Sequence, residues 1–264
     1  MSTKMSTKMS MKVPIKQSIK QSTRRSRDAI GWVCSLGLIA TLGLGCAGAP
    51  RSVEYDLQSN SRVTKDGLHR VRFTGFAGVF VKPGASFASY DRVMIDPLTV
   101  TYQSTPNPPD AINLRRGNFA LSEESMVRLK QIGRDALVEK FTKSKTFTVV
   151  EEAGPGVLRV SGHIVDLVIN APPFRGGERD FLSSAGEMTL FLDVRDSLTA
   201  NELTRMIDRR EISPAATSTV GHFESSPVSI WSSVRDLFGE WSRLFGGWLE
   251  NLQELDQIPP APSA

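Results

Sequence analysis

The chain has 264 residues and a formal net charge of +4, but its charges are unevenly distributed. Residues 1–45 contain eight of the 32 basic residues and one of the 28 acidic ones, which leaves 24 basic against 27 acidic residues, a net charge of −3, in the rest. The remaining chain therefore lacks the basic excess that nucleic-acid binding requires, and no nucleic-acid partner is expected. It is long enough for one domain with a substantial hydrophobic core.

The N-terminal segment has the three parts of a secretory signal. Basic residues precede an apolar run, Ala29–Cys46, and small residues, Gly45 and Ala47, flank its final cysteine. This pattern resembles a bacterial lipoprotein signal. We therefore predict a signal peptide over residues 1–45, cleavage before Cys46, and lipidation of the Cys46 thiol.

Two other fates of this segment stay open. The apolar run is about 17 residues long, near the lower limit for crossing a bilayer, so it could remain uncleaved as a signal anchor. Cleavage after Ala47 or Ala49 would instead release a periplasmic protein without lipid.

Lipidation would determine both location and cysteine chemistry. A single acyl chain binds membranes only marginally, whereas the three chains of such lipoproteins anchor them stably. Ala47 follows Cys46 in place of the aspartate typical of inner-membrane retention, so we predict an outer-membrane anchor facing the periplasm, with membrane lipid as a partner through acylated Cys46.

Cleavage would also remove Cys34, which leaves no cysteine pair for a disulfide or a zinc site.

Composition divides the mature chain into three parts. Residues 46–70 are polar and are predicted to form a flexible, lipidated tether. Residues 71–255 are predicted to form a single α+β domain, with a mostly antiparallel sheet, a central amphipathic helix and a C-terminal helix packed on one face. Residues 256–264 are rich in proline and are expected to be disordered.

Hydrophobic periodicity predicts the elements of that domain. A β-branched run over residues 90–102 indicates a strand interrupted at Pro97, and residues 188–194 and 203–212 indicate further strands. Ser122 is a suitable N-cap for a helix whose apolar residues recur every three or four positions up to Phe141. Residues 146–150 and 157–169 flank a Gly-Pro-Gly turn and are expected to form a β-hairpin.

The C-terminal helix, over residues 228–255, carries an apolar stripe with three tryptophans. The stripe is typical of a helix that covers a sheet, which would place the tryptophans in the core. The alternative is a helix that binds a partner protein through Trp231, Trp241 and Trp248. The polar face has more acidic than basic residues, which disfavours a membrane surface as that partner.

Several short segments resemble a known family. The segments are Phe73–Phe76, Tyr90–Pro97, the helix after Ser122, and Gly154–Val160. On these residues the chain is similar to bacterial lipoproteins of domain of unknown function 3313. The resemblance implies an envelope lipoprotein of Gram-negative bacteria and brings no activity or catalytic residues with it.

Candidate catalytic residues are scattered. His69, His163 and His222 lie far apart without a metal-ligand neighbour at helix or hairpin spacing, so neither a metal nor a cofactor is expected. His163 and Asp166 could form a catalytic pair, but positions i and i+3 of a regular strand face opposite sides.

The expected function is therefore a non-catalytic binding or accessory role in the cell envelope. The alternative is a periplasmic enzyme or small-ligand binder that acts on envelope material through carboxylates such as Asp96, Asp166 or Glu187.

Overall fold

The chain divides into two units, Met1–Cys46 and Ala47–Ala264. A computed structural model describes parts of the second unit: residues 52–58, 63–73, 75–106, 118–170, 181–182, 184–213, 223–224 and 226–262. The predicted signal peptide with Cys46 lies outside the described residues, and so do residues 107–117, 171–180 and 214–222.

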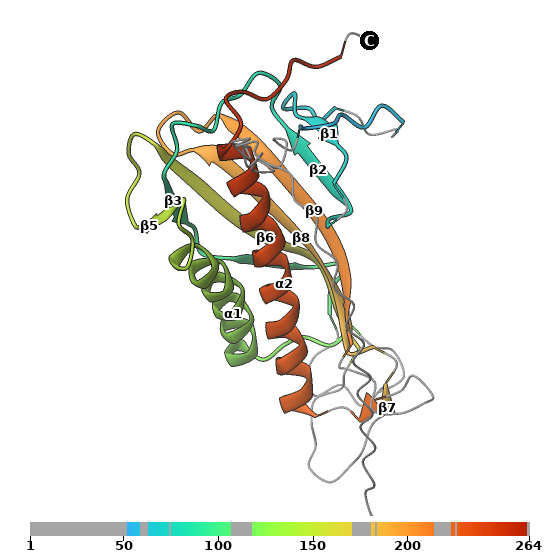
Figure 1. Cartoon of the computed structure of the whole chain (residues 1–264). Helices are drawn as coiled ribbons and strands as arrows, with labels where there is room; N and C mark the ends of the chain where they lie inside the picture. Colours follow the sequence, from blue (N-terminus) through green and yellow to red (C-terminus); the bar gives the residue numbers. More distant parts are fainter. Residues whose placement is uncertain are drawn as a thin grey trace, which may run out of the picture. The chain divides into compact units, whose positions relative to one another are not determined.

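One eight-stranded sheet forms the centre of the domain (Figure 1). Seven of its strands lie in the order β1-β2-β9-β8-β6-β3-β5, and β4 pairs beside β3 with the long strand β6. The strands are β1 (His69–Val71), β2 (Gly78–Val81), β3 (Arg92–Ile95), β4 (Thr99–Tyr102), β5 (Thr148–Val150), β6 (Val157–Ile169), β8 (Gly186–Asp196) and β9 (Glu202–Ile212). The short strands β7 (Phe181–Leu182) and β10 (Phe223–Glu224) pair separately.

The predicted hairpin between residues 146–150 and 157–169 is wrong. Strands β5 and β6 both pair with β3 in parallel, one on each side, so that Arg92 lies opposite Thr148 on one side and Val157 on the other. The turn between them is correctly placed, but turn residues do not say which strand lies beside which. The α+β class is confirmed, and the sheet is mixed, with parallel pairs at the β3 end and antiparallel pairs through β8, β9 and β2.

Two helices lie side by side on one face of the sheet (Figure 1). Helix α1 (Glu123–Thr142) begins after Ser122, whose hydroxyl accepts a hydrogen bond from the amide of Ser125. Helix α2 (Pro227–Gln253) begins with proline in its first turn and a capping box in which Ser226 and Ser229 exchange hydrogen bonds. The caps satisfy amides that the first helical turns leave unpaired.

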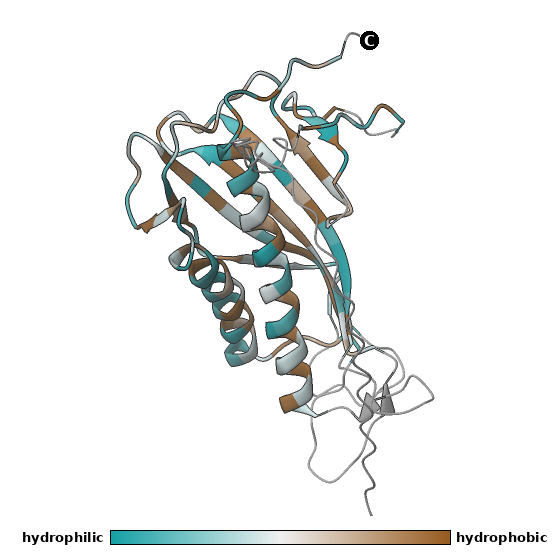
Figure 2. Ribbon diagram, viewed as in Figure 1, coloured by the Kyte–Doolittle hydropathy of each residue, from teal (hydrophilic) through white to brown (hydrophobic). Residues whose placement is uncertain are grey.

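The core fills the space between the helices and the sheet. Along β6, Leu158, Val160 and Ile164 are buried, whereas the alternate residues Ser161 and His163 are partly exposed. Figure 2 shows hydrophobic and hydrophilic residues interleaved along the helices and the central strands in the same way. Because strand side chains alternate between faces, the sheet has one face toward the helices and an opposite face that bears polar residues.

The ordered domain begins upstream of the predicted boundary at residue 71. Tyr55 forms a β-bridge with Val71, and its hydroxyl donates to the carbonyl of Pro259 over 2.6 Å. Leu68, inside the predicted tether, is completely buried. The prediction of a flexible tether over residues 46–70 is therefore wrong for its described part, because a few apolar side chains dock this polar segment against the β1 edge.

The domain also extends past residue 255. Ile258 is 1% exposed, its amide donates to the carbonyl of Ala85, and its own carbonyl accepts from the amide of Gly84. The predicted disordered tail over residues 256–264 is thus contradicted at its beginning. A single buried isoleucine between polar and proline residues gives no periodic signal, which explains the error.

Among the described residues, neither helix is long and apolar enough to cross a membrane.

Candidate functional site

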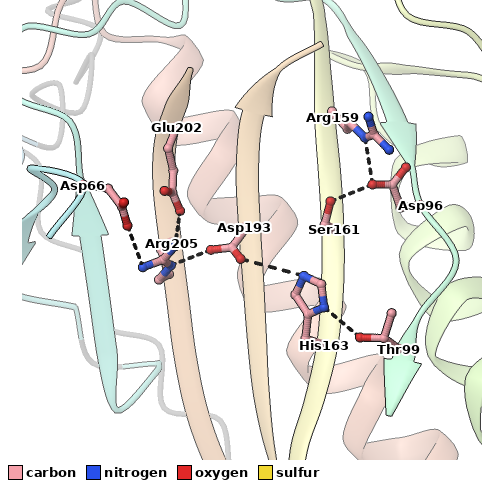
Figure 3. A network of polar contacts seen from close by, with 9 residues as sticks. All are labelled: Asp66, Asp96, Thr99, Arg159, Ser161, His163, Asp193, Glu202 and Arg205. Atoms are coloured by element: carbon pink, nitrogen blue, oxygen red, sulfur yellow. Dashed lines mark hydrogen bonds and ion pairs between the residues drawn. The ribbon is translucent and has the colours of Figure 1, made fainter. Parts of the chain in front are cut away.

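The sheet face opposite the helices carries a network of polar side chains (Figure 3). We call this side of β6, β8 and β9, together with the adjoining β4, the open face. The helices lie behind the sheet in this view, so the network points away from them. Its members are Asp66, Asp96, Thr99, Arg159, Ser161, His163, Asp193, Glu202 and Arg205.

The centre of the network aligns a hydroxyl, an imidazole and a carboxylate. Thr99 Oγ1 and His163 Nδ1 are 2.7 Å apart and form a hydrogen bond. On the other side of the ring, His163 Nε2 lies 3.8 Å from Asp193 Oδ2, which is beyond hydrogen-bonding distance. Strand pairing builds this line, because β6 has β4 on one side and β8 on the other.

Arg205 connects three carboxylates at one end of the network. Its guanidinium donates to Asp193 and to Glu202, each over 2.5 Å, and lies 3.4 Å from Asp66. The side chains of Asp193 and Glu202 are each only 10% exposed. Buried carboxylates need such a partner, and here one cation serves three acids.

This excess of acid affects protonation. Burial, together with a hydrogen bond to Asp193, raises the pKa of Glu202 to about 7, although the charge of Arg205 opposes the shift. Glu202 and Asp193 are thus a close carboxyl pair of which one member can hold a proton near neutral pH.

At the other end of the network, Asp96 forms an ion pair with Arg159. Asp96 accepts hydrogen bonds from Arg159 over 2.8 Å and from Ser161 over 2.6 Å. Burial would raise the pKa of Asp96, but these hydrogen bonds and the charge of Arg159 lower it below its ordinary value. Asp96 is therefore an ionised structural partner, which does not suit a general acid.

An open pocket of about 710 Å³ adjoins the Arg205 end of the network. Its charged lining residues are Asp66, Lys82, Arg195 and Glu202. The volume lies in the range of small-molecule sites, but the lining has few of the apolar and aromatic groups that such sites use. Among the described residues, no group of three or more histidine, cysteine and carboxylate side chains is arranged to hold a metal ion.

The three carboxylates proposed from the sequence do not converge. Asp96 lies just after β3, whereas Glu187 lies at the start of β8 and makes a two-hydrogen-bond ion pair with Arg209. The hydrogen bond from Arg209 lowers the pKa of Glu187. Asp166 occupies an irregular position in β6 with a positive φ of 53°, where the ladder with β8 shifts register.

The histidines are equally separate. His69 lies on β1, where its ring packs edge-on against Tyr55, and His222 is outside the described residues. His163 faces Asp193 of the neighbouring strand in place of Asp166.

The tryptophans of α2 occupy different environments. Trp241 is 1% and Trp248 6% exposed, and both belong to the core. Their indole groups donate to Asp208 and Thr204 of β9. The partner-binding assignment is wrong for these two residues, because the apolar stripe covers the sheet. Trp231 is partly exposed, and the guanidinium of Arg128 lies 4.7 Å from its ring centre.

The sequence reasoning missed Thr99, Asp193, Glu202 and Arg205. These residues lie in different parts of the chain, and their positions in the sequence match no known motif. Only the pairing of strands in the sheet brings them together. The one available signal was the period-two alternation of β8 and β9, which places Asp193 and Arg205 on polar faces.

A mixed sheet with two helices on one face and a charge-paired network on the other defines an α+β domain. The chain belongs to the family described as Protein of unknown function (DUF3313), whose model matches residues 60–245. The match confirms the family part of the resemblance, domain of unknown function 3313, and its description assigns no activity.

The chain has distant similarity to a number of solved structures, among them the following three. The PelC dodecamer from Paraburkholderia phytofirmans has 10% identity and a TM-score of 0.32, covering 63% of this chain and 95% of that one. Protein XCC0632 from Xanthomonas campestris, of family DUF330, has 13% identity and a TM-score of 0.33, with coverages of 65% and 89%. A putative neuraminyllactose-binding hemagglutinin homolog from Helicobacter pylori has 9% identity and a TM-score of 0.34, with coverages of 66% and 95%.

These similarities are too low to support an argument about function. No curated protein is significantly similar to the chain in sequence.

Proposed function

We propose that the chain is a non-catalytic binding or accessory lipoprotein of the cell envelope, anchored in the outer membrane through acylated Cys46 and facing the periplasm. In this proposal its open face contacts a partner protein of the envelope. The anchor is supported by the signal-like sequence that ends at Cys46.

The observation that carries the binding role is the organisation of the open face. Its charged groups are preset by ion pairs, from Asp96 with Arg159 to Arg205 with Asp193 and Glu202. Such an array fixes the positions of hydrogen-bonding groups without the rearrangement cost that flexible side chains add to association. Polar groups held in fixed positions contribute to specificity more than to affinity when a partner carries charges complementary to them. An accessory protein requires such specificity.

The same pairing argues against nucleophilic catalysis. In a hydroxyl–imidazole–carboxylate triad the acid holds the imidazole in position and stabilises its protonated form. Here Asp193 is 3.8 Å from His163, and its other oxygen is engaged by Arg205 at 2.5 Å. The carboxylate is thus already neutralised by a cation, which weakens its support for a protonated histidine.

Site-specific photo-crosslinking in cells tests the binding role. We would place the photoreactive residue p-benzoylphenylalanine at Arg209, an exposed position on the open face, and at Val127, which is 61% exposed on α1. The proposal predicts one discrete protein adduct from position 209 and a clearly weaker one from position 127. Equal adducts from both positions, or none from position 209, would contradict it.

The second candidate function is an enzyme or small-ligand binder, favoured by one observation. Thr99, His163 and Asp193 are aligned, and a pocket lined by Lys82 and Glu202 adjoins the same network. Incubation of purified protein with envelope material, followed by mass spectrometry of the products, tests it. Turnover that His163→Gln and Thr99→Val both abolish would favour this candidate over the binding role.

A further inference from the structure

An apolar groove lies at the β1–β2 edge of the sheet, beside the C-terminal end of α2. It has a volume of about 600 Å³ and is bounded by the first described segment, by β1 and β2, and by the end of the helix. Its apolar lining residues are Val53, Val71, Phe73, Phe76, Val79, Trp248, Leu252 and Leu255. Both the volume and this apolar, aromatic lining are typical of small-molecule sites.

The charged groups that line the groove are already paired. Arg70 Nε lies 3.3 Å from Asp56 Oδ2, and Arg70 also donates to the carbonyl of Ala77. Arg72 pairs with Glu54 at the exposed rim over 2.7 Å. On the apolar side, the rings of Phe73 and Trp248 pack edge-to-face with centroids 5.2 Å apart. The groove therefore suits a ligand that is apolar over most of its length, because most of its lining is apolar and its charged groups already have partners.

The chain itself leads into this groove. Ser52 and Val53, the first described residues, belong to its lining, and Cys46 lies six residues upstream. Six residues span at most about 20 Å when extended, so a group attached to Cys46 starts within reach of the groove.

We propose that the groove binds one acyl chain of the lipid attached to Cys46 of the same molecule. This inference rests on the proposed lipidation of Cys46. The bilayer and the groove both keep an acyl chain out of water, so its transfer from one to the other costs little, and the short tether keeps it at high effective concentration beside the groove. The domain would then be held with its β1–β2 side toward the lipid.

Photo-crosslinking with a labelled lipid tests this inference on the full chain in intact envelopes. Cells would be fed a palmitate analogue with a diazirine at its end, and the irradiated protein would be digested and analysed by mass spectrometry. We expect a crosslink within one molecule, from the lipid on Cys46 to peptides that contain Phe76 or Trp248.

Two exposed alanines provide a matched pair of variants. Ala77 lines the mouth of the groove, whereas Ala88 lies in a turn outside it. Ala77→Phe should narrow the groove and reduce the internal crosslink severalfold, whereas Ala88→Phe should leave it unchanged. Equal reduction by both variants, or by neither, would overturn the inference.

The remaining outcomes separate this inference from the proposed function. A labelled Cys46 without a crosslink to the groove would overturn the groove assignment and leave the lipoprotein proposal intact. A phospholipid crosslinked to the groove in Cys46→Ser as strongly as in the wild type would identify a lipid from the membrane in place of the chain's own. Absence of label on wild-type Cys46 would overturn the lipidation, and the groove inference with it.

Discussion

Trp241 donates its indole N–H to the carboxylate of Asp208 over 2.8 Å, at the interface between α2 and β9. The same carboxylate accepts from the guanidinium of Arg210 over 2.7 Å and from the amide of Ala77 over 3.1 Å. Asp208 is 7% exposed, so these donors are what make a buried charge tolerable. Helix α2, whose apolar stripe was a candidate partner-binding surface, is therefore held on its own sheet by this polar contact as well as by packing.

Replacement of tryptophan along α2 should have position-dependent effects on stability. Trp241→Phe removes a donor from Asp208 and volume from the core, and we expect a loss of about 2 kcal/mol in the free energy of unfolding. Trp231→Phe alters only a partly exposed ring beside Arg128 and should cost about 0.5 kcal/mol. Urea denaturation of both variants checks this difference, and equal losses would contradict the core assignment of Trp241.

Two glycines in the helices should respond oppositely to alanine. A Cβ at Gly133 would lie 2.6 Å from Leu98 and 2.9 Å from Phe238, so Gly133→Ala should destabilise the fold by about 1–3 kcal/mol. A Cβ at Gly239 meets nothing within 4 Å, and Gly239→Ala should stabilise the helix by about 0.5–1 kcal/mol. Thermal unfolding followed by circular dichroism measures both, and stabilisation by both would show that α1 approaches the sheet less closely.

The carboxyl pair at Arg205 predicts an unusual pH dependence. The pKa of Glu202 is raised to about 7 in the folded chain, so its protonation favours folding, and this stabilisation is lost as the pH rises through about 7. Glu202→Gln stays neutral, so its stability relative to the wild type should improve by about 2 kcal/mol between pH 5 and pH 8.

A matched control for Glu202 is Glu187. The hydrogen bond from Arg209 lowers the pKa of Glu187, so this carboxylate is ionised in the folded chain at both pH values. The difference in unfolding free energy between Glu187→Gln and the wild type should therefore change little from pH 5 to pH 8. If urea denaturation gave the same pH trend for both variants, the pairing of Glu202 with Asp193 would be wrong.

The hydrogen bond from Tyr55 to Pro259 should stabilise the two ends of the domain together. Tyr55→Phe removes this bond and should cost about 1 kcal/mol. Hydrogen exchange should then be faster for two amides that join the first segment to β1. The amide of Asp56 donates to the carbonyl of Arg70, and the amide of Arg72 donates to the carbonyl of Glu54. Unchanged exchange at both amides would mean that this segment docks independently of the C-terminal residues.

Local signals predicted the elements well and their neighbours poorly. The N-cap at Ser122 and the alternation over residues 188–194 led directly to α1 and β8, because capping and periodicity are properties of adjacent residues. The parallel placement of β5 and β6 around β3 depends on contacts between distant parts of the chain. No local pattern contains that information.

The candidate site was unpredictable for the same reason. Asp166, three positions along the chain, is the acidic residue nearest to His163 in the sequence, but the carboxylate beside His163 in the fold is Asp193 on the adjacent strand. The tryptophan stripe was visible in the sequence, yet an apolar stripe looks the same whether it covers a sheet or a partner. The buried acceptor Asp208 on β9 distinguishes the two, and only the fold brings it to Trp241.

The central proposal, an envelope lipoprotein anchored through Cys46, is tested most directly by the intact mass and the membrane fraction of the protein from envelopes, compared between wild type and Cys46→Ser. The account predicts a wild-type chain that begins at an acylated Cys46 and fractionates with the outer membrane, and a variant that is lost from it. A chain that retains residues 29–45 in both proteins would contradict the account and indicate an uncleaved anchor.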